Sequence, residues 1–203
     1  MARQTGKGGM SIVIDRLRRV SRRRFLPGHL QSLGFRRLCE VGVFSGNHLR
    51  ELLFAEPLEL VAIDAWQADL EGCGMTITQA KMDEFYESIL ELSRKHPCIK
   101  VLRMLSTDAA QQFADGYFDF VYLDANHTYS SVKSDLEAWW SKVRPGGVLA
   151  GHDYVDQTTN DGTKFGVIQS VDEFITTHKL RDNFAVIDRK GHTPFPTWLI
   201  EKP

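Results

Sequence analysis

Short apolar segments alternate with segments of helical spacing along most of the chain, and this alternation constrains the fold more than any other feature. The helical patterns lie between consecutive apolar segments, which is typical of parallel strands joined by crossover helices. We therefore predict an α/β fold with a doubly wound, mostly parallel seven-stranded sheet whose last strand is antiparallel. The expected strands are 37–42, 58–64, 99–105, 118–124, 146–151, 183–188 and 197–201, and the expected helices are 48–55, 78–96, 107–113, 130–143 and 167–178.

Length and composition fit this fold. The 203 residues are 42% hydrophobic and 25% charged, which excludes a disordered chain or a fibre and suits one globular domain. The three cysteines lack the spacing of a zinc site, and no apolar run is long enough for a transmembrane helix. The first ten residues lack the apolar core of a secretion signal. We therefore expect a cytoplasmic protein with no membrane span.

Basic residues are concentrated at the N-terminus. Residues 1–37 hold ten of the 25 Lys and Arg residues but one of the 26 Asp and Glu residues. We divide the chain into a basic arm or helix, residues 1–35, and a main domain, residues 36–203. The arm could bind a phosphate-rich surface, or it could be a solvated helix docked on the acidic body. The second interpretation is favoured, because charge runs are commonly surface features.

Glycines and acids follow the expected strands at the ends where ligands bind in such sheets. The segment EVGVFSG at 40–46 places an acid and two glycines at a strand–helix turn. Glycine permits a tight turn and a close approach of a ligand. The turn lacks the GxGxxG dinucleotide fingerprint, which argues against a dehydrogenase. Without a pyrophosphate, the acid Glu40 is available to receive an ammonium group.

Asp64 ends the next expected strand, 22 residues after Gly42. An acid at this position can accept hydrogen bonds from both ribose hydroxyls of an adenosine. Ala65 and Trp66 follow, and the indole could face the adenine ring. The two features together predict a nucleoside site.

Further motifs come in a characteristic order: FVYLDANHTY at 120–129, Asp135, Trp139, PGG at 145–147 and GHDY at 151–154. Together with the two motifs above, this set resembles class I S-adenosylmethionine-dependent methyltransferases over residues 36–201. It is most similar to small-molecule O-methyltransferases of the catechol and macrolide-sugar types. The resemblance implies a Rossmann-like fold, S-adenosyl-L-methionine as cofactor and a divalent metal, Mg or Mn.

The resemblance also implies roles for particular residues. Asp64 would hold the ribose, and Ser106 would contact the adenine beside Ala65 and Trp66. Asp124 would border the cofactor and bind the metal together with Asp153 and His152. The methionine end of the cofactor would lie against Glu40, Gly42, Phe44, Gly46 and His48.

His152 departs from the family, which usually has Asp, Glu or Asn at that position. Magnesium prefers oxygen ligands, so either His152 does not bind the metal or a softer ion such as manganese is tolerated. His127 lies three residues after Asp124, where relatives carry a Lys or His general base. A neutral imidazole can take the proton of an acceptor hydroxyl, because its pKa lies near the working pH.

The leading hypothesis is metal-assisted O-methylation of a small sugar-bearing or phenolic acceptor. The polar stretch 155–166 could close over this acceptor as a lid, and residues 65–86 could form the other wall. Nucleic-acid methylation through the arm is an alternative, although DANH stands at 124–127 where such enzymes carry an Asn-Pro-Pro-Tyr-like or Asp-Pro-Pro-Tyr-like tetrapeptide. A non-catalytic cofactor-binding protein is a third. A homo-oligomer is left open.

Overall fold

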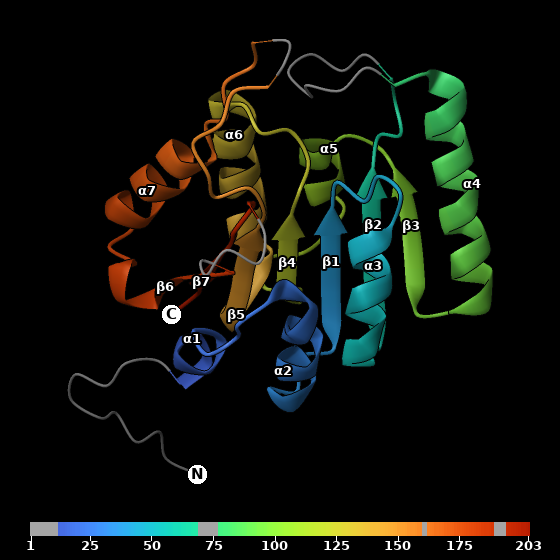
Figure 1. The fold of residues 1–203 in the computed structure, drawn as a ribbon. Coiled ribbons are helices and arrows are strands. Elements are labelled where there is room, and N and C mark those ends of the chain that lie inside the picture. The colour runs from blue at the N-terminus through green and yellow to red at the C-terminus, as the bar shows by residue number, and fades with distance from the viewer. Residues whose placement is uncertain (1–11, 69–76, 160–161, 189–193) are drawn as a thin grey trace.

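The computed structural model describes residues 12–68, 77–159, 162–188 and 194–203. Its centre is one seven-stranded sheet of order β3-β2-β1-β4-β5-β7-β6 (Figure 1). The strands are β1 (Arg37–Val41), β2 (Glu59–Asp64), β3 (Ile99–Arg103), β4 (Phe118–Leu123), β5 (Val143–Gly151), β6 (Phe184–Ile187) and β7 (Thr197–Glu201). The helices are α1 (Ile12–Leu17), α2 (Leu26–Ser32), α3 (Asn47–Leu52), α4 (Gln79–Lys95), α5 (Ser106–Ala110), α6 (Tyr129–Trp140) and α7 (Val167–Thr177). Short 3₁₀ turns lie at Arg23–Phe25, Leu53–Ala55 and Arg181–Asn183.

The strand directions confirm the predicted α/β, Rossmann-like class. Strands β1 to β5 pair in parallel, whereas β7 runs antiparallel to both β5 and β6. The order changes direction between β1 and β4, because β2 and β3 extend from one side of β1 and β4 follows on the other. A ligand crevice is expected at this switch point, beyond the carboxyl ends of β1 and β4.

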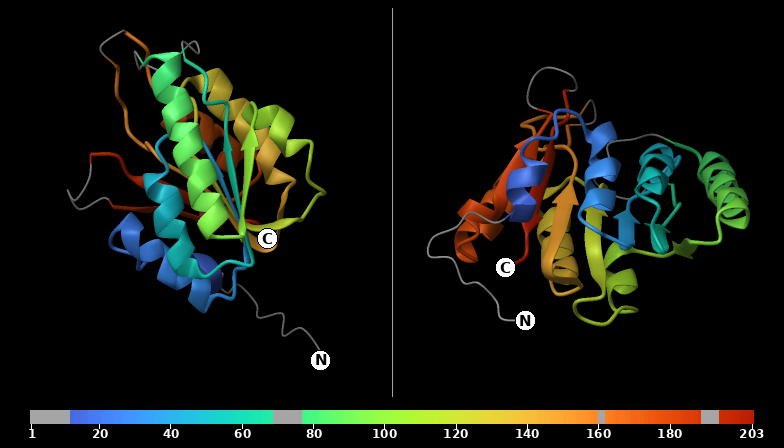
Figure 2. Two further views of the ribbon diagram at one scale, coloured as in Figure 1. Left: turned by 90° about the vertical axis from the view of Figure 1, so that its right-hand side faces the viewer. Right: turned by 90° about the horizontal axis from the view of Figure 1, so that it is seen from below.

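Helices cover both faces of the sheet, and Figure 2 shows these layers from below. One face buries residues of α1 to α4, among them Leu17, Leu30, Leu49 and Ile89. The other buries residues of α5 to α7, including Trp139 of α6. Successive strand residues point to opposite faces, so each central strand contributes to both cores. This explains why strands such as LELVAID at 58–64 are almost continuously apolar.

Strand β5 begins three residues earlier than the sequence indicates. The segment RPGG at 144–147 reads as a turn, but it belongs to the strand. The β4–β5 register shifts between Phe118 and Phe120, and a bulge of this kind accommodates a proline that cannot donate to the ladder. The backbone of Gly146 and Gly147 instead bonds with Lys202, just after β7.

The N-terminal segment packs on the same core as the sheet. Ile14 and Leu17 of α1 are buried, and the backbone N–H of Ile14 donates to Glu201 Oε2 at 2.8 Å. Arg18 donates through Nη2 to the carbonyls of Asp182 and Phe184. These contacts favour the docked-helix interpretation for residues 12–32, while residues 1–11 of the predicted arm lie outside the described residues. Among the described helices, none has the length and apolar character that a membrane crossing requires.

Candidate functional site

The turn after β1 is built around one close backbone approach. Gly42 has a φ of +89°, and a Cβ there would lie 2.0 Å from the carbonyl oxygen of Asp124. Only glycine can therefore bring this turn against the end of β4. Gly46 has a φ of +78° and precedes α3, where a Cβ would meet Ile89 and Arg50. Gly46 thus serves the start of the helix and its packing against Ile89.

Asp64 joins the turn after β1 to the segment after β2. Its Oδ2 accepts from the N–H of Phe44 and its Oδ1 from the N–H of Trp66, both at 2.7 Å. Burial raises the pKa of Asp64, and these backbone hydrogen bonds oppose the shift. A carboxylate oxygen can accept more than one hydrogen bond, so Asp64 can also accept hydroxyl hydrogens from a ligand.

The prediction that the indole of Trp66 faces a ligand is wrong. Its side chain is fully buried, its Nε1 donates to the carbonyl of Phe44 at 3.0 Å, and its ring packs against Tyr86. A buried indole N–H needs an acceptor, and the carbonyl of Phe44 provides it when the ring packs behind the turn. Trp66 therefore supports the site from beneath.

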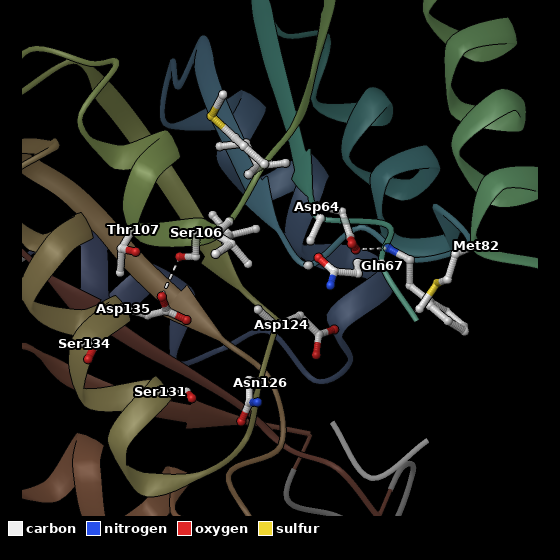
Figure 3. Close-up of a pocket in the computed structure, with 18 of the residues that line it drawn as sticks. Asp64, Gln67, Met82, Ser106, Thr107, Asp124, Asn126, Ser131, Ser134 and Asp135 are labelled. Atoms are coloured by element: carbon white, nitrogen blue, oxygen red, sulfur yellow. Dashed lines mark hydrogen bonds between the residues drawn. The ribbon is translucent and has the colours of Figure 1, made fainter. Parts of the chain in front are cut away.

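A cavity of about 520 Å³, here called the edge cavity, opens beyond the carboxyl ends of β1, β2 and β4. Figure 3 shows Asp64 on one side of it, Ser106 and Asp135 on the other, and Asp124 between them. The predicted site residues in its lining are Gly42, Phe44, Asp64, Ala65, Ser106 and Asp124. Gln67, Ile77 and Met82 also line it, so only part of the predicted acceptor wall 65–86 lies at the cavity. Residues 69–76 of that wall lie outside the described residues.

Glu40 and His48 lie outside this lining, buried on the side of the sheet that carries α1 to α4. His48 Nδ1 is 3.3 Å from Glu40 Oε1. Burial raises the pKa of Glu40 well above its usual range and lowers that of His48 to about 3. Glu40 Oε2 and both ring nitrogens of His48 have no hydrogen-bond partner among the described residues. The pair is thus a buried group beneath the turn whose hydrogen-bonding capacity is only partly used.

Arg23 reaches this buried region, and its only signal in the sequence is the run of basic residues around it. Its Nη1 donates to the hydroxyl of Tyr122 at 3.4 Å, and its Nε lies 3.9 Å from Glu51 Oε2. Burial disfavours the guanidinium charge, but Tyr122, Asp124 and Glu51 outweigh it and raise the pKa. One arginine of the predicted arm therefore lies half-buried beside this region.

Beside the edge cavity, four titratable side chains form the charged cluster: Asp124, His127, His152 and Asp153. His127 Nε2 lies 2.6 Å from Asp153 Oδ2 and 3.5 Å from Asp124 Oδ1. His152 Nδ1 lies 3.3 Å from Asp153 Oδ2 and 3.8 Å from Asp124 Oδ1. The structure thus brings together the predicted base and all three predicted metal ligands.

The charges within this cluster depart from the prediction of a neutral imidazole at His127. Burial opposes the charged form, but the contacts with Asp124 and Asp153 outweigh it and raise the pKa of His127 to about 9. The pKa of Asp153 lies far below its usual range. Burial alone would raise this pKa, but the contacts with His127 and His152 lower it by more. His127 is therefore protonated at neutral pH in this arrangement, because two carboxylates face one imidazole.

The polar stretch 155–166 packs directly on the charged cluster. The ring of Phe165 stacks on His127 with centroids 4.7 Å apart, and the N–H of Gly166 donates to the carbonyl of His127 at 2.8 Å. Asn160 and Asp161, within the predicted lid, lie outside the described residues. The described part of the stretch thus covers one face of the imidazole.

A family match spans the residues of both the edge cavity and the charged cluster. Residues 39–154 match a family model described as a methyltransferase domain. An uncharacterized protein of Sinorhizobium fredii, y4gI, is 30% identical over 96 residues, 47% of this chain and 10% of that protein. The chain therefore spans about a tenth of the length of this curated relative.

Solved structures share the fold at low identity. An O-methyltransferase from Bacillus cereus in complex with SAH has a TM-score of 0.57 at 19% identity, covering 96% of this chain and 93% of that one. A Corynebacterium glutamicum protein reaches 0.60 at 13% identity, covering 95% and 91%. Spermidine synthase from Thermotoga maritima reaches 0.53 at 10% identity, covering 83% and 54%, so the fold alone does not identify the reaction. It is the family match, over more than half of the chain, that shows it to belong to the methyltransferase-domain family.

Proposed function

We propose that the chain transfers the methyl group of S-adenosylmethionine to a hydroxyl of a small molecule, with help from a divalent metal. The observation that carries this proposal is the position of Asp124, which lines the edge cavity and also belongs to the charged cluster. The cavity can hold the cofactor and the cluster can hold the reacting hydroxyl. One carboxylate then borders both the methyl donor and the acceptor.

The edge cavity suits an adenosine. Asp64 retains the lone pairs to accept ribose hydroxyls, and apolar side chains such as Ile63 and Met104 line the space beside it. Gly42 lines the cavity as well, and its lack of a side chain lets the turn lie against the backbone of Asp124. The sulfonium methyl is already activated, so the protein mainly supplies position and electrostatics.

The charged cluster has the donor chemistry of a cation site. Asp124, His152 and Asp153 each offer one ligand atom, and these atoms lie within 4.8 Å of one another. Two carboxylates and one imidazole suit manganese better than magnesium, which prefers oxygen ligands alone. A divalent ion bound there would stabilise the acceptor's oxyanion as a Lewis acid.

His127 is the candidate general base, at Nε2. Because it is protonated between the two carboxylates, it can take the acceptor's proton only after it has lost its own. A divalent ion on Asp124 and Asp153 would favour that loss by neutralising their charge. Nε2 of His127 faces Asp124 and Asp153, and Phe165 shields one face of the ring from water. The Bacillus cereus neighbour is an O-methyltransferase, which supports oxygen as the methylated atom. Sugar-bearing and phenolic acceptors both fit this chemistry, and the experiment must include both.

The test combines calorimetry with a methyl-transfer assay. S-adenosylhomocysteine should bind the metal-depleted chain, because the edge cavity does not depend on the ion. Methyl transfer to a panel of phenols and glycosides should stop with a chelator and return with manganese or magnesium. Turnover that a chelator leaves unchanged would contradict the metal, and binding without turnover on any acceptor would favour a non-catalytic cofactor-binding protein.

The nucleic-acid alternative needs its own control. Methylation of RNA, with binding that weakens steeply with salt, would replace the small-molecule proposal. The docked position of α1 and the burial of part of Arg23 leave less of the arm free for such a role.

A further inference from the structure

Asp135 is a buried acid for which the proposed reaction has no use. It lies on α6, its residue surface is 6% exposed, and it lines the edge cavity opposite Asp64. Burial raises its pKa to about 6, and a hydrogen bond from Ser106 holds the pKa lower than burial alone would. An acid in such a place requires a donor to compensate its desolvation.

A short hydrogen-bond chain orients this acid. The buried Trp139 donates through Nε1 to Ser106 Oγ at 2.9 Å, and Ser106 Oγ donates to Asp135 Oδ1 at 2.5 Å. The indole is donor-only, so the Ser106 hydroxyl must accept from it and direct its own hydrogen to Asp135. The chain therefore fixes Asp135 as an acceptor.

The second oxygen of Asp135 has no donor within the described part of the chain. Figure 3 shows the carboxyl of Asp135 with one oxygen on Ser106 and the other turned away from it, at the side of the cavity. Leu105 and Thr107 flank Ser106 in the same lining, and neither offers a cation to this oxygen. The missing donor is thus to be sought in the ligand.

Adenine carries such a donor in its exocyclic amine. We propose that Asp135, positioned by Ser106, selects adenine in the edge cavity by accepting a hydrogen bond from the exocyclic amine of the base. This inference rests on the proposed function, which places the cofactor's ribose at Asp64. It makes Asp135 a specificity-determining residue and Ser106 its positioning residue.

The experiment compares two ligands that differ at this one group. S-adenosylhomocysteine has the amine, whereas its deaminated analogue, S-inosylhomocysteine, has a carbonyl oxygen that would face the Asp135 carboxylate. Calorimetry on the full chain should show the analogue binding about tenfold to a hundredfold more weakly, since it leaves a buried acceptor unpaired. The ratio of the two affinities is the readout.

Asp135→Asn tests the same contact from the protein side. The amide can still accept from Ser106, but it now presents an N–H₂ to the ligand. The preference for the adenine compound should therefore collapse or reverse, because the carbonyl of the analogue can accept from the amide. Asp108→Asn is the matched control, since Asp108 is an exposed acid of α5 outside the cavity lining, and its ratio should equal that of the wild type.

Ser106→Ala keeps the test decisive if Asp135→Asn does not fold. Ser106→Ala removes the hydroxyl that positions Asp135 but keeps the acid. The preference for S-adenosylhomocysteine over S-inosylhomocysteine should therefore become smaller without disappearing. Equal affinities of the wild type for the two ligands, or an unchanged ratio in a folded Asp135→Asn, would overturn the inference and leave the proposed function standing. If the folded wild type binds neither ligand, the proposed function fails and this inference fails with it.

Discussion

The edge cavity and the charged cluster meet at Asp124, but they satisfy their acids in different ways. In the edge cavity, Asp64 accepts from the backbone N–H groups of Phe44 and Trp66. In the charged cluster, Asp153 faces the side chains of His127 and His152. Backbone donors are set by the fold, whereas imidazoles can change their charge and partner. The comparison indicates a rigid cavity for an invariant group beside a cluster built to exchange protons and ligands.

Of the variants considered, His127→Ala should show the largest difference between its effect on turnover and its effect on cofactor affinity. Loss of a general base lowers turnover by about 10²–10⁴-fold. The affinity for S-adenosylhomocysteine should stay unchanged, because His127 lies in the charged cluster. A methyl-transfer assay and calorimetry on the same preparation give both quantities.

His96→Ala provides the control for that variant, since His96 is exposed at the end of α4. Turnover that survives His127→Ala would mean that the proton leaves by another route. A parallel loss of cofactor affinity would mean that the two regions are not separable.

Gly42→Ala tests the point where the two regions touch. The new Cβ would lie 2.0 Å from the carbonyl oxygen of Asp124 and would require a φ of +89°. Left-handed backbone costs about 1–2 kcal/mol and overpacking about 1–3 kcal/mol, so the free energy of unfolding should fall by about 3 kcal/mol. Urea denaturation measures this loss.

Gly34→Ala separates the two causes. Gly34 also has a positive φ, +74°, but a Cβ there would meet nothing within 4 Å. Its loss should therefore be limited to the backbone term, about 1–2 kcal/mol. Equal losses for the two variants would show that the turn can move away from Asp124.

A smaller effect is expected from Asp64→Asn, confined to the edge cavity. The amide keeps one acceptor oxygen but sets an N–H₂ against a backbone N–H. Affinity for S-adenosylhomocysteine should fall about tenfold to a hundredfold, in keeping with about 1–3 kcal/mol for a hydrogen bond to a charged group. Turnover at saturating cofactor should change much less.

Glu84→Gln, on the exposed side of α4, is the control for Asp64→Asn. If Asp64→Asn binds S-adenosylhomocysteine as tightly as the wild type does, the ribose does not bind at Asp64. Loss of turnover without loss of affinity would place Asp64 with the charged cluster instead.

The parts of the site that the sequence predicts are those encoded within a few residues of a strand end. Gly42 and Asp64 stand out because each directly follows or ends an apolar run, and parallel strands bring such ends to one edge. The same argument predicts the meeting of Asp124 with Asp153, since both follow neighbouring strands. The seven strands and their directions follow from the alternation of strand and helix patterns.

The parts that sequence reasoning missed depend on partners far along the chain. Asp135 and Arg23 were not assigned to the site, because Asp135 meets Ser106, 29 residues away, and Arg23 meets Tyr122, 99 residues away. The indole of Trp66 was misplaced because its acceptor, the carbonyl of Phe44, lies 22 residues away. A single sequence records which residues can make such contacts but not which of them the packing brings together.

The last prediction concerns how the stability of Asp135→Asn depends on pH. It tests whether the edge cavity excludes water from Asp135. Burial raises the pKa of Asp135 to about 6, against about 3.9 for an unperturbed aspartate. Between these values the folded protein holds a proton that the unfolded chain has released, so this carboxyl makes the free energy of unfolding fall as the pH rises from about 4 to 6. Asp135→Asn lacks this carboxyl, so its free energy of unfolding should not show this decrease. Relative to the wild type, the variant should therefore become more stable by about 2 kcal/mol between pH 4 and pH 7. Urea denaturation without cofactor at both pH values measures the difference, and other titrating groups cancel in it. If the two proteins instead lose stability in parallel, water reaches Asp135 freely and the contrast between a rigid cavity and an exchangeable cluster does not hold at this acid.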